Sequence, residues 1–222
     1  MPPQGFSWVE KPHLAALARP SDANEMAWLR RQGIELLIAL TEDPPRRDQW
    51  TALSDAQLLA QCEVDAYRAS GPGGQKRNKT SSAVRLRHPP SGLIVIAEES
   101  RSQHENRARA LKRLRQALFL KMRDDLPPEA RSTEALAAHP DYRAARGTDG
   151  RLDLGRKDPR FWPAAGVVLD VLAAVGARVS EAAEALGVST AILIAFLETD
   201  PKVWEQANQL RARFGHKPLR GD

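Results

Sequence analysis

Ala83-Val84-Arg85-Leu86-Arg87-His88 is followed by Pro89-Pro90-Ser91-Gly92 and then by Leu93-Ile94-Val95-Ile96-Ala97. The first run alternates apolar with basic side chains, which is the period of a half-buried strand. The proline, serine and glycine residues predict a turn, and the last run consists mainly of strand-forming residues. The stretch therefore predicts a β-hairpin over residues 83–97, and the neighbouring segments can be read outward from it.

The segments on either side of this hairpin extend the prediction to a whole domain. Residues 64–70 read as a further strand, and downstream Ser100 or Ser102 can cap a long helix. The apolar residues of that helix recur at helical spacing and mark its buried stripe: Leu111, Leu114, Leu118 and Met122. We expect an α+β fold with a small mixed or antiparallel sheet, a long helix and a further helical domain.

Four regions are predicted along the chain. Residues 1–50 read as strand, helix and strand, and residues 51–123 hold the hairpin and the long helix. Residues 124–159 are rich in Pro, Gly, Asp and Arg, which predicts a linker or a loosely ordered stretch. Residues 160–222 predict a wholly helical C-terminal domain.

Part of this helical region resembles a helix-turn-helix. The resemblance lies in Glu181-Ala182-Ala183-Glu184-Ala185-Leu186-Gly187-Val188-Ser189, followed by Ile192 and Leu193. The segment in the place of a recognition helix, residues 190–198, offers almost no donors or acceptors for base edges. We therefore expect it to pack against the protein or to dock on a larger partner, and we do not expect DNA as that partner.

Positive charge is concentrated in one segment of the chain. Residues 71–123 contain thirteen Lys and Arg against three Glu, a net charge of +10 within a chain whose total is +5. Such a distribution is typical of a nucleic-acid binder, although a solvated basic helix is the alternative.

No apolar run approaches the roughly 20 residues of a membrane span, and Cys62 is the only cysteine, so we expect a cytoplasmic protein without disulfides. No Cys/His/Asp cluster has metal-ligand spacing, and we expect neither a metal nor a cofactor.

A glycine-rich loop joins residues 64–70 to the hairpin. It reads Ser70-Gly71-Pro72-Gly73-Gly74-Gln75-Lys76-Arg77-Asn78-Lys79-Thr80. Glycines permit backbone shapes that other residues avoid, and they let a large substrate approach the main chain. A backbone N–H group in such a loop can face a developing oxyanion, and Gln75 can both donate and accept hydrogen bonds. Because no nucleophile–base pair is evident nearby, the expected chemistry is the positioning of a water molecule with electrostatic stabilisation.

Residues in and around this loop carry a resemblance to a known family. Ala69–Gln75, Asn78-Lys79-Thr80, Ala83-Val84-Arg85, His88, Ser91-Gly92 and Arg101-Ser102-Gln103-x-x-Asn106 closely resemble the catalytic domain of class I peptide chain release factors. The resemblance covers about residues 58–122. It implies that Gly73, Gly74 and Gln75 act in the peptidyl-transferase centre of the large ribosomal subunit, where they would hydrolyse the ester bond of peptidyl-tRNA. The backbone amide of Gln75 would stabilise the tetrahedral transition state, and its side chain would orient or select the water.

The same resemblance implies contacts with large-subunit RNA. The residues expected to make them are Lys76, Arg77, Asn78, Lys79, Arg85, Arg101, Gln103 and Arg107. Arg77 stands where the family commonly has an apolar residue. Residues 51–222 also resemble a group of short bacterial release-factor-like proteins with a helical extension, and no segment resembles a stop-codon-reading domain. We therefore expect codon-independent release of peptides from stalled ribosomes; the alternative is a ribosome- or RNA-binding protein without hydrolase activity.

The first fifty residues resemble a different family. Phe6-Ser7-Trp8-Val9, Ala18-Arg19-Pro20, Trp28–Ile34 and Leu40-Thr41-Glu42 are similar to the start of dual-specificity phosphatases. Cys62 and Arg68 have the Cys-x5-Arg spacing of the phosphate loop of those enzymes, but the residues between them include no glycine. A phosphate cradle needs free backbone amides, so we interpret the spacing as coincidence and expect no phosphatase site.

Overall fold

The computed structural model describes residues 7–10, 14–16, 28–29, 31–32, 46–68, 81–147 and 150–220. The chain divides into two compact units, residues 1–44 and residues 45–222. In the first unit, strand β1 (Ser7–Glu10) pairs antiparallel with β2 (Leu14–Ala16). The expected strand at residues 34–40 lies outside the described residues, and the phosphatase resemblance of this unit stays a prediction.

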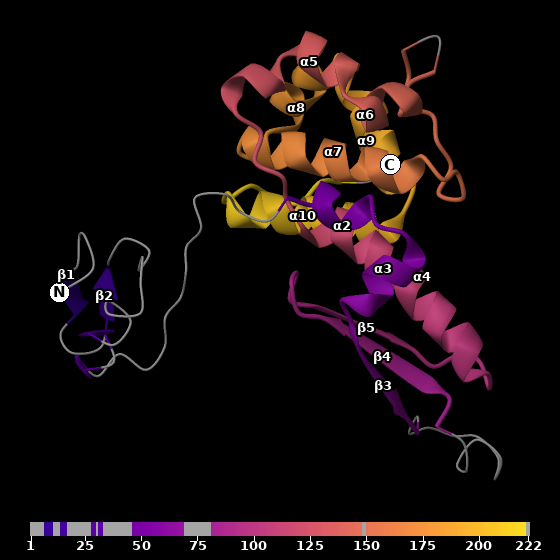
Figure 1. Cartoon of the computed structure of the whole chain (residues 1–222). Helices are drawn as coiled ribbons and strands as arrows, with labels where there is room; N and C mark the ends of the chain where they lie inside the picture. Colours follow the sequence, from indigo (N-terminus) through magenta and orange to yellow (C-terminus); the bar gives the residue numbers. More distant parts are fainter. Residues whose placement is uncertain are drawn as a thin grey trace. The chain divides into compact units, whose positions relative to one another are not determined.

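A three-stranded antiparallel sheet is the centre of the first half of the second unit (Figure 1). Its strands lie in the order β3 (Glu63–Tyr67), β4 (Ala83–His88) and β5 (Leu93–Ala97). The predicted hairpin is confirmed, because β4 pairs with β5 from Val84 and Ala97 at one end to His88 and Leu93 at the other. Gly92 in its turn has a φ of +68°, a conformation that residues with a Cβ rarely adopt.

One face of this sheet is covered by the long helix α4 (Gln103–Lys121) (Figure 1). Ser102 is its N-cap, with Oγ accepting from the Glu105 N–H group at 3.3 Å. Two short helices, α2 (Asp48–Thr51) and α3 (Asp55–Ala60), add to the same core, and Ser54 caps α3 in a capping box. The buried residues of this sheet core are Trp50, Leu58, Val84, Leu86, Ala97, Ala110, Leu111, Leu114 and Leu118.

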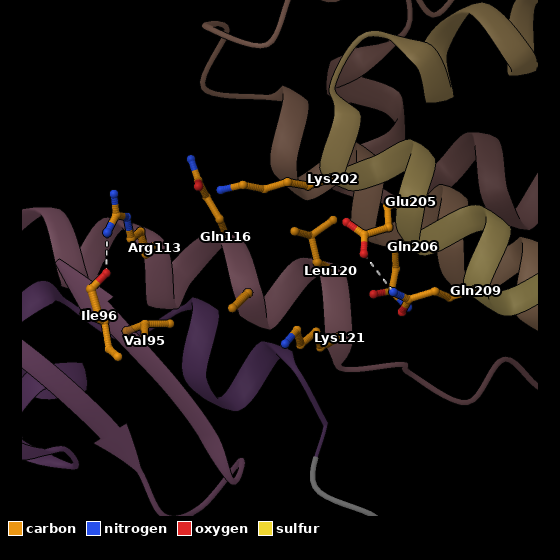
Figure 2. A pocket seen from close by; sticks show the side chains of 11 residues that line it. Val95, Ile96, Arg113, Gln116, Leu120, Lys121, Lys202, Glu205, Gln206 and Gln209 are labelled. Carbon is orange, nitrogen blue, oxygen red and sulfur yellow. Dashed lines mark hydrogen bonds between the residues drawn. The ribbon is translucent and has the colours of Figure 1, made fainter. Parts of the chain in front are cut away.

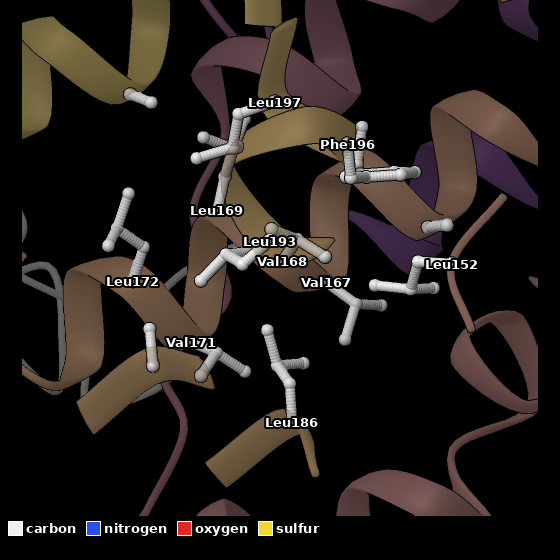
Figure 3. Packing of buried hydrophobic residues seen from close by; sticks show 14 of the residues in the cluster. Leu152, Val167, Val168, Leu169, Val171, Leu172, Leu186, Leu193, Phe196 and Leu197 are labelled. Carbon is white, nitrogen blue, oxygen red and sulfur yellow. The ribbon is translucent and has the colours of Figure 1, made fainter. Parts of the chain in front are cut away.

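The rest of the unit is helical and has a second core. Its elements are the 3-10 helix η1 (Pro128–Arg131) and helices α5 (Thr133–Ala138), α6 (Pro140–Ala145), α7 (Phe161–Ala174), α8 (Val179–Leu186), α9 (Thr190–Glu198) and α10 (Pro201–Arg213). Helix α7 is the centre of this core, since Val167, Val168, Leu169, Val171 and Leu172 are all buried (Figure 3). The predicted α+β class, with an antiparallel sheet and a C-terminal helical domain, is confirmed.

Helices α8 and α9 have the geometry of a helix-turn-helix. The angle between them is 100°, and Gly187 ends α8 with a φ of +65°. Ser189 caps α9 by accepting from the Ile192 N–H group at 3.2 Å. No single helix within the described ranges is long and apolar enough to cross a membrane; α8 and α9 reach that length and composition only as a pair, across this bend.

The segment expected to be a loosely ordered linker is different in the structure. Residues 128–145 form η1, α5 and α6, and Leu136 and Tyr142 are buried in the helical core. The Tyr142 hydroxyl donates to the Leu186 carbonyl at 2.5 Å. These helices are one or two turns long; η1 buries no side chain, α5 buries one and α6 buries two. A helical repeat is therefore too short to stand out from the surrounding Pro, Asp and Arg residues.

The basic C-terminal residues are anchored to the helical core as far as Leu219. His216 Nε2 lies 2.9 Å from the Gly176 carbonyl oxygen, and the Arg211 guanidinium donates to the carbonyls of Ala177 and Lys217. The Leu219 N–H group donates to Asn208 Oδ1 at 2.7 Å. This segment is thus part of the folded domain over the residues that the structure describes.

A buried ionic cluster joins the end of α4 to α7. Arg47 is 4% exposed and Asp170 is 2% exposed, and Arg47 NH1 lies 2.8 Å from Asp170 Oδ2. Arg47 also pairs with Asp124 at 3.1 Å, while Arg123 donates to Asp170 Oδ1 at 2.7 Å. Burial raises the pKa of Asp170 to about 6 in spite of both arginines, and burial lowers the pKa of Arg123 to about 10.

Replacing Asp170 with Asn should destabilise the second unit strongly. The change keeps the side-chain shape but leaves two buried guanidinium groups with only Asp124 as a counter-charge, so we expect the free energy of unfolding to fall by about 3–5 kcal/mol. Glu181→Gln is the matched control, because it removes one partner of an exposed pair with Arg178 and should change the free energy by less than about 1 kcal/mol. Urea denaturation of the two variants measures both values, and equal effects would contradict the prediction.

Candidate functional site

The glycine-rich loop runs between two paired strand ends. Residues 69–80 lie outside the described residues, and with them Gly73, Gly74 and Gln75 and the predicted RNA contacts Lys76, Arg77, Asn78 and Lys79. Tyr67 at the end of β3 pairs directly with Ala83 at the start of β4. The loop therefore leaves and re-enters the sheet at adjacent positions, and the described residues around these positions define its base.

Asn106 holds this base from the first turns of α4. Its side chain is fully buried, and Nδ2 donates to the Ser82 carbonyl at 2.7 Å and to the Ser100 carbonyl at 2.8 Å. Its Oδ1 accepts from the Ser100 N–H group at 2.9 Å. One amide thereby fixes the residue that precedes β4 and the turn between β5 and α4. Asn106 belongs to the stretch that carries the family resemblance, and the sequence alone predicts no role for it.

Two further side chains, those of Arg113 and Tyr67, hold the turn between β5 and α4. Arg113 donates to the Ile96 carbonyl and to the Glu99 carboxylate. The hydrogen bond to Glu99 is the main reason why the pKa of Glu99 lies below its usual value. The Tyr67 hydroxyl, at the last residue of β3, donates to Glu98 at 3.4 Å. The turn is thus tied to α4 on one side and to the strand that enters the loop on the other.

Three of the predicted RNA-contacting residues lie around this base. Arg101, Gln103 and Arg107 are exposed, in the turn before α4 and in its first two turns. Neither Arg101 nor Arg107 pairs with an acid in the part of the chain that the structure describes, whereas Arg109 and Arg115 pair with Glu105 and Asp55. The structure therefore brings unpaired positive charge to the end of α4 that carries Asn106.

Arg85, also predicted to contact RNA, is placed differently. It projects from the face of the sheet opposite α4, and its NH2 group lies 2.8 Å from Asp65 on the neighbouring strand. Both side chains are about half exposed. An exposed pair of this kind contributes under about 1 kcal/mol, so Asp65 can give way to a phosphate at small cost.

His88 and Cys62 are structural residues. His88 is fully buried with its Nε2 3.1 Å from Gln61 Oε1 and its Nδ1 2.7 Å from Ser91 Oγ, and Trp50 meets its ring edge-on. The Cys62 thiol donates to the Leu58 carbonyl at 3.2 Å, and burial raises its pKa. A phosphatase nucleophile needs a lowered thiol pKa, so this environment agrees with reading the Cys-x5-Arg spacing as coincidence.

Comparison with known proteins shows what the segment around the loop base is similar to. Residues 58–147 match the family model described as the RF-1 domain. The predicted resemblance to class I peptide chain release factors is thereby confirmed. The match runs from α3 through α6, and it includes residues 124–147 of the segment that we expected to be a linker.

The individual relatives are peptide chain release factors. A peptide chain release factor 2 from Paramagnetospirillum magneticum is 37% identical over 43% of this chain and 30% of its own length. Peptide chain release factor 1 from Solidesulfovibrio magneticus is 59% identical over 25% of this chain and 16% of its own length. A peptide chain release factor 1 from Gluconacetobacter diazotrophicus is 43% identical over 52% of this chain and 27% of its own length. The chain thus spans less than a third of each of these relatives.

Replacing Asn106 with Ala should weaken the base of the loop. Three backbone groups of Ser82 and Ser100 lose their partner in a buried setting, so we expect the free energy of unfolding to fall by about 2–4 kcal/mol. Gln103→Ala, at an exposed position one turn away, is the control and should have an effect of no more than about 0.5 kcal/mol. Denaturant titration compares the two variants, and a neutral Asn106→Ala variant would contradict the assigned role.

His88 predicts a pH dependence with a defined sign. Because burial lowers its pKa in the folded protein, the unfolded chain takes up a proton first as the pH falls below about 6.5. Wild type should have a higher free energy of unfolding than His88→Gln at pH 7.5. The difference between the two should decrease toward pH 5.5, by at most about 1.4 kcal/mol per pH unit. Urea titrations at several pH values measure this difference, and a difference that stays constant or grows would show the prediction to be wrong.

Proposed function

We propose that this protein hydrolyses peptidyl-tRNA on the ribosome and does so without reading a stop codon. The observation that carries the proposal is the RF-1 domain match, within which the sequence has Gly73-Gly74-Gln75 between two paired strands. The names of the relatives support a role in peptide release. The codon-independent form rests on the resemblance of residues 51–222 to a group of short bacterial release-factor-like proteins with a helical extension.

In this proposal the loop acts by geometry and charge. Water attacks the ester carbonyl carbon, the bond to the ribose oxygen of the tRNA breaks, and a proton from the water ends on that oxygen. The backbone N–H of Gln75 stabilises the oxyanion, and its side chain orients the water. Gly73 and Gly74 allow the backbone shape that this requires.

The described residues around the loop support this role by fixing its two ends. Asn106 and Arg113 hold the chain that enters β4 and the turn that precedes α4. Arg101 and Arg107, both exposed and without acidic partners among the described residues, would contact phosphates of large-subunit RNA, and Gln103 lies between them. These contacts would hold the loop base against its RNA partner.

The experiment is peptide release from purified ribosomes that carry peptidyl-tRNA, with and without a stop codon. Wild type should release the peptide in both cases. Gly74→Ala should disturb the backbone shape that aims the Gln75 N–H at the oxyanion, and because losing one such donor costs about a hundredfold, the rate should fall by at least about that factor. Gly155→Ala is the matched control, since no atom lies within 4 Å of the added Cβ, and it should release at the wild-type rate.

The remaining outcomes separate the alternatives. Release only at a stop codon would contradict codon independence and leave the hydrolase proposal in place. Ribosome binding without release in either case would contradict hydrolysis and favour the RNA-binding alternative.

A further inference from the structure

A groove lies where the RF-1 domain meets the helical extension. One wall is α4, the other is α10, and β5 closes one end (Figure 2). Its volume is about 370 Å³, which is in the range of ordinary small-ligand sites. Since α10 lies outside residues 58–147, the RF-1 domain alone supplies only one side of this groove.

The polar groups around the groove are largely unused by the protein. Lys121 and Lys202 form no ion pair within the described residues, and the side chains of Gln116 and Gln206 have no hydrogen-bond partner there. Figure 2 shows Lys202 extending from α10 toward Gln116 on α4. The acid on this rim, Glu205, accepts from Gln209 at 3.1 Å. The groove therefore presents two free cations and two free amides.

The floor of the groove is apolar. Val95, Ala117 and Leu120 line it, whereas Ile96 pairs with Arg85 on the opposite face of the sheet and contributes its carbonyl. Arg113, which also lines the groove, is held in place by its bonds to the Ile96 carbonyl and to Glu99. A flat apolar group resting on this floor would have amides at its edge and ammonium groups within reach.

This combination matches an unstacked nucleotide. A base can lie on apolar side chains, glutamine amides can donate to and accept from its edge, and lysines can neutralise the adjacent phosphates. An acidic peptide would use the lysines but leave the two amides and the apolar floor without a counterpart. The chemistry therefore favours RNA over a peptide.

We propose that the groove between α4 and α10 binds one unstacked nucleotide of single-stranded RNA together with its phosphates. Lys121 and Lys202 contact the phosphates, Gln116 and Gln206 contact the base edge, and Ala117 and Leu120 support its face. This site shares Arg113 and Ile96 with the loop base, but its proposed contacts come from other residues, and the proposal does not require that the loop hydrolyse anything.

The test measures binding of the full chain to a fluorescent mixed-sequence RNA of roughly twelve nucleotides, a length within the site sizes of single-strand binders. Lys121→Gln with Lys202→Gln should weaken binding about tenfold or more, and it should reduce the slope of log affinity against log salt by about 1.4, because two single-strand phosphate contacts are lost. The matched control is Arg156→Gln with Lys157→Gln, which removes the same charge from exposed positions away from the groove. The control should leave the slope within about 0.3 of wild type.

Charge-neutral variants separate a groove from general electrostatics. Ala117→Phe fills the floor, and Gln116→Ala with Gln206→Ala removes the amides; each should weaken binding about fivefold or more without changing the salt slope. Thermal melting checks that both variants remain folded. If Ala117→Phe does not fold, the double glutamine variant alone tests the groove. With 4-thiouridine in the same RNA, ultraviolet crosslinks should fall on peptides from α4 and α10. Equal losses in the lysine and control pairs, or neutral variants that bind like wild type, would overturn the proposal.

Discussion

The arrangement of the second unit depends on two buried carboxylate–guanidinium contacts, those of Asp170 with Arg47 and with Arg123. Such contacts add little net stability, because desolvation of the charges offsets their attraction, and the raised pKa of Asp170 reflects that cost. Their value lies in geometry. Arg123 reaches the carbonyls of Phe119 on α4 and Gly166 on α7, so misplacing either helix would leave a buried charge unpaired. Gly166 on α7 also serves this cluster. A Cβ at this position would lie 2.9 Å from the Arg47 guanidinium, so the glycine makes room for that side chain although glycine weakens a helix.

Because the cluster fixes the end of α4, that helix is shared by the two cores. Leu118 is buried against the sheet, and Leu120, two residues later, is buried in the helical core. Asn106, near the opposite end, holds the base of the loop. A helix of 19 residues is about 28 Å long. The loop base and the helical extension are therefore attached to one continuous helix.

The sequence predicted those parts of the fold that local patterns determine. The hairpin at residues 83–97 followed from alternation and a Pro-Gly turn, and Ser102, one of the two residues expected to cap the long helix, is its N-cap. It did not predict η1, α5 and α6, whose stability comes from contacts with distant helices such as that of Tyr142 with Leu186. Nor did it predict the roles of Arg47 and Asp170, which are 123 positions apart and meet only in the fold.

For the site, Arg101, Gln103 and Arg107 were named from the family resemblance, and their exposure around the loop base is compatible with RNA contact. The pairing of Arg85 with Asp65 depends on strand register and could not be read from charge alone.

The distribution of unpaired charge along α4 limits the kind of RNA that this protein can engage. The arginines in its middle, Arg109, Arg113 and Arg115, are paired with acids, whereas Arg107 near one end, Lys112, and Lys121 at the other end have no acidic partner within the described residues. Arg107 and Lys121 are fourteen residues apart, which on a helix is about 21 Å. One phosphate step in a single strand is far shorter than this, so a strand that contacts Lys121 reaches Arg107 only after several nucleotides. A folded RNA, which presents phosphates from separate strands, can meet both ends at once. The spacing of these cations thus suits a structured RNA that carries a single-stranded stretch, with the groove beside α10 accepting a nucleotide that such a fold leaves unstacked.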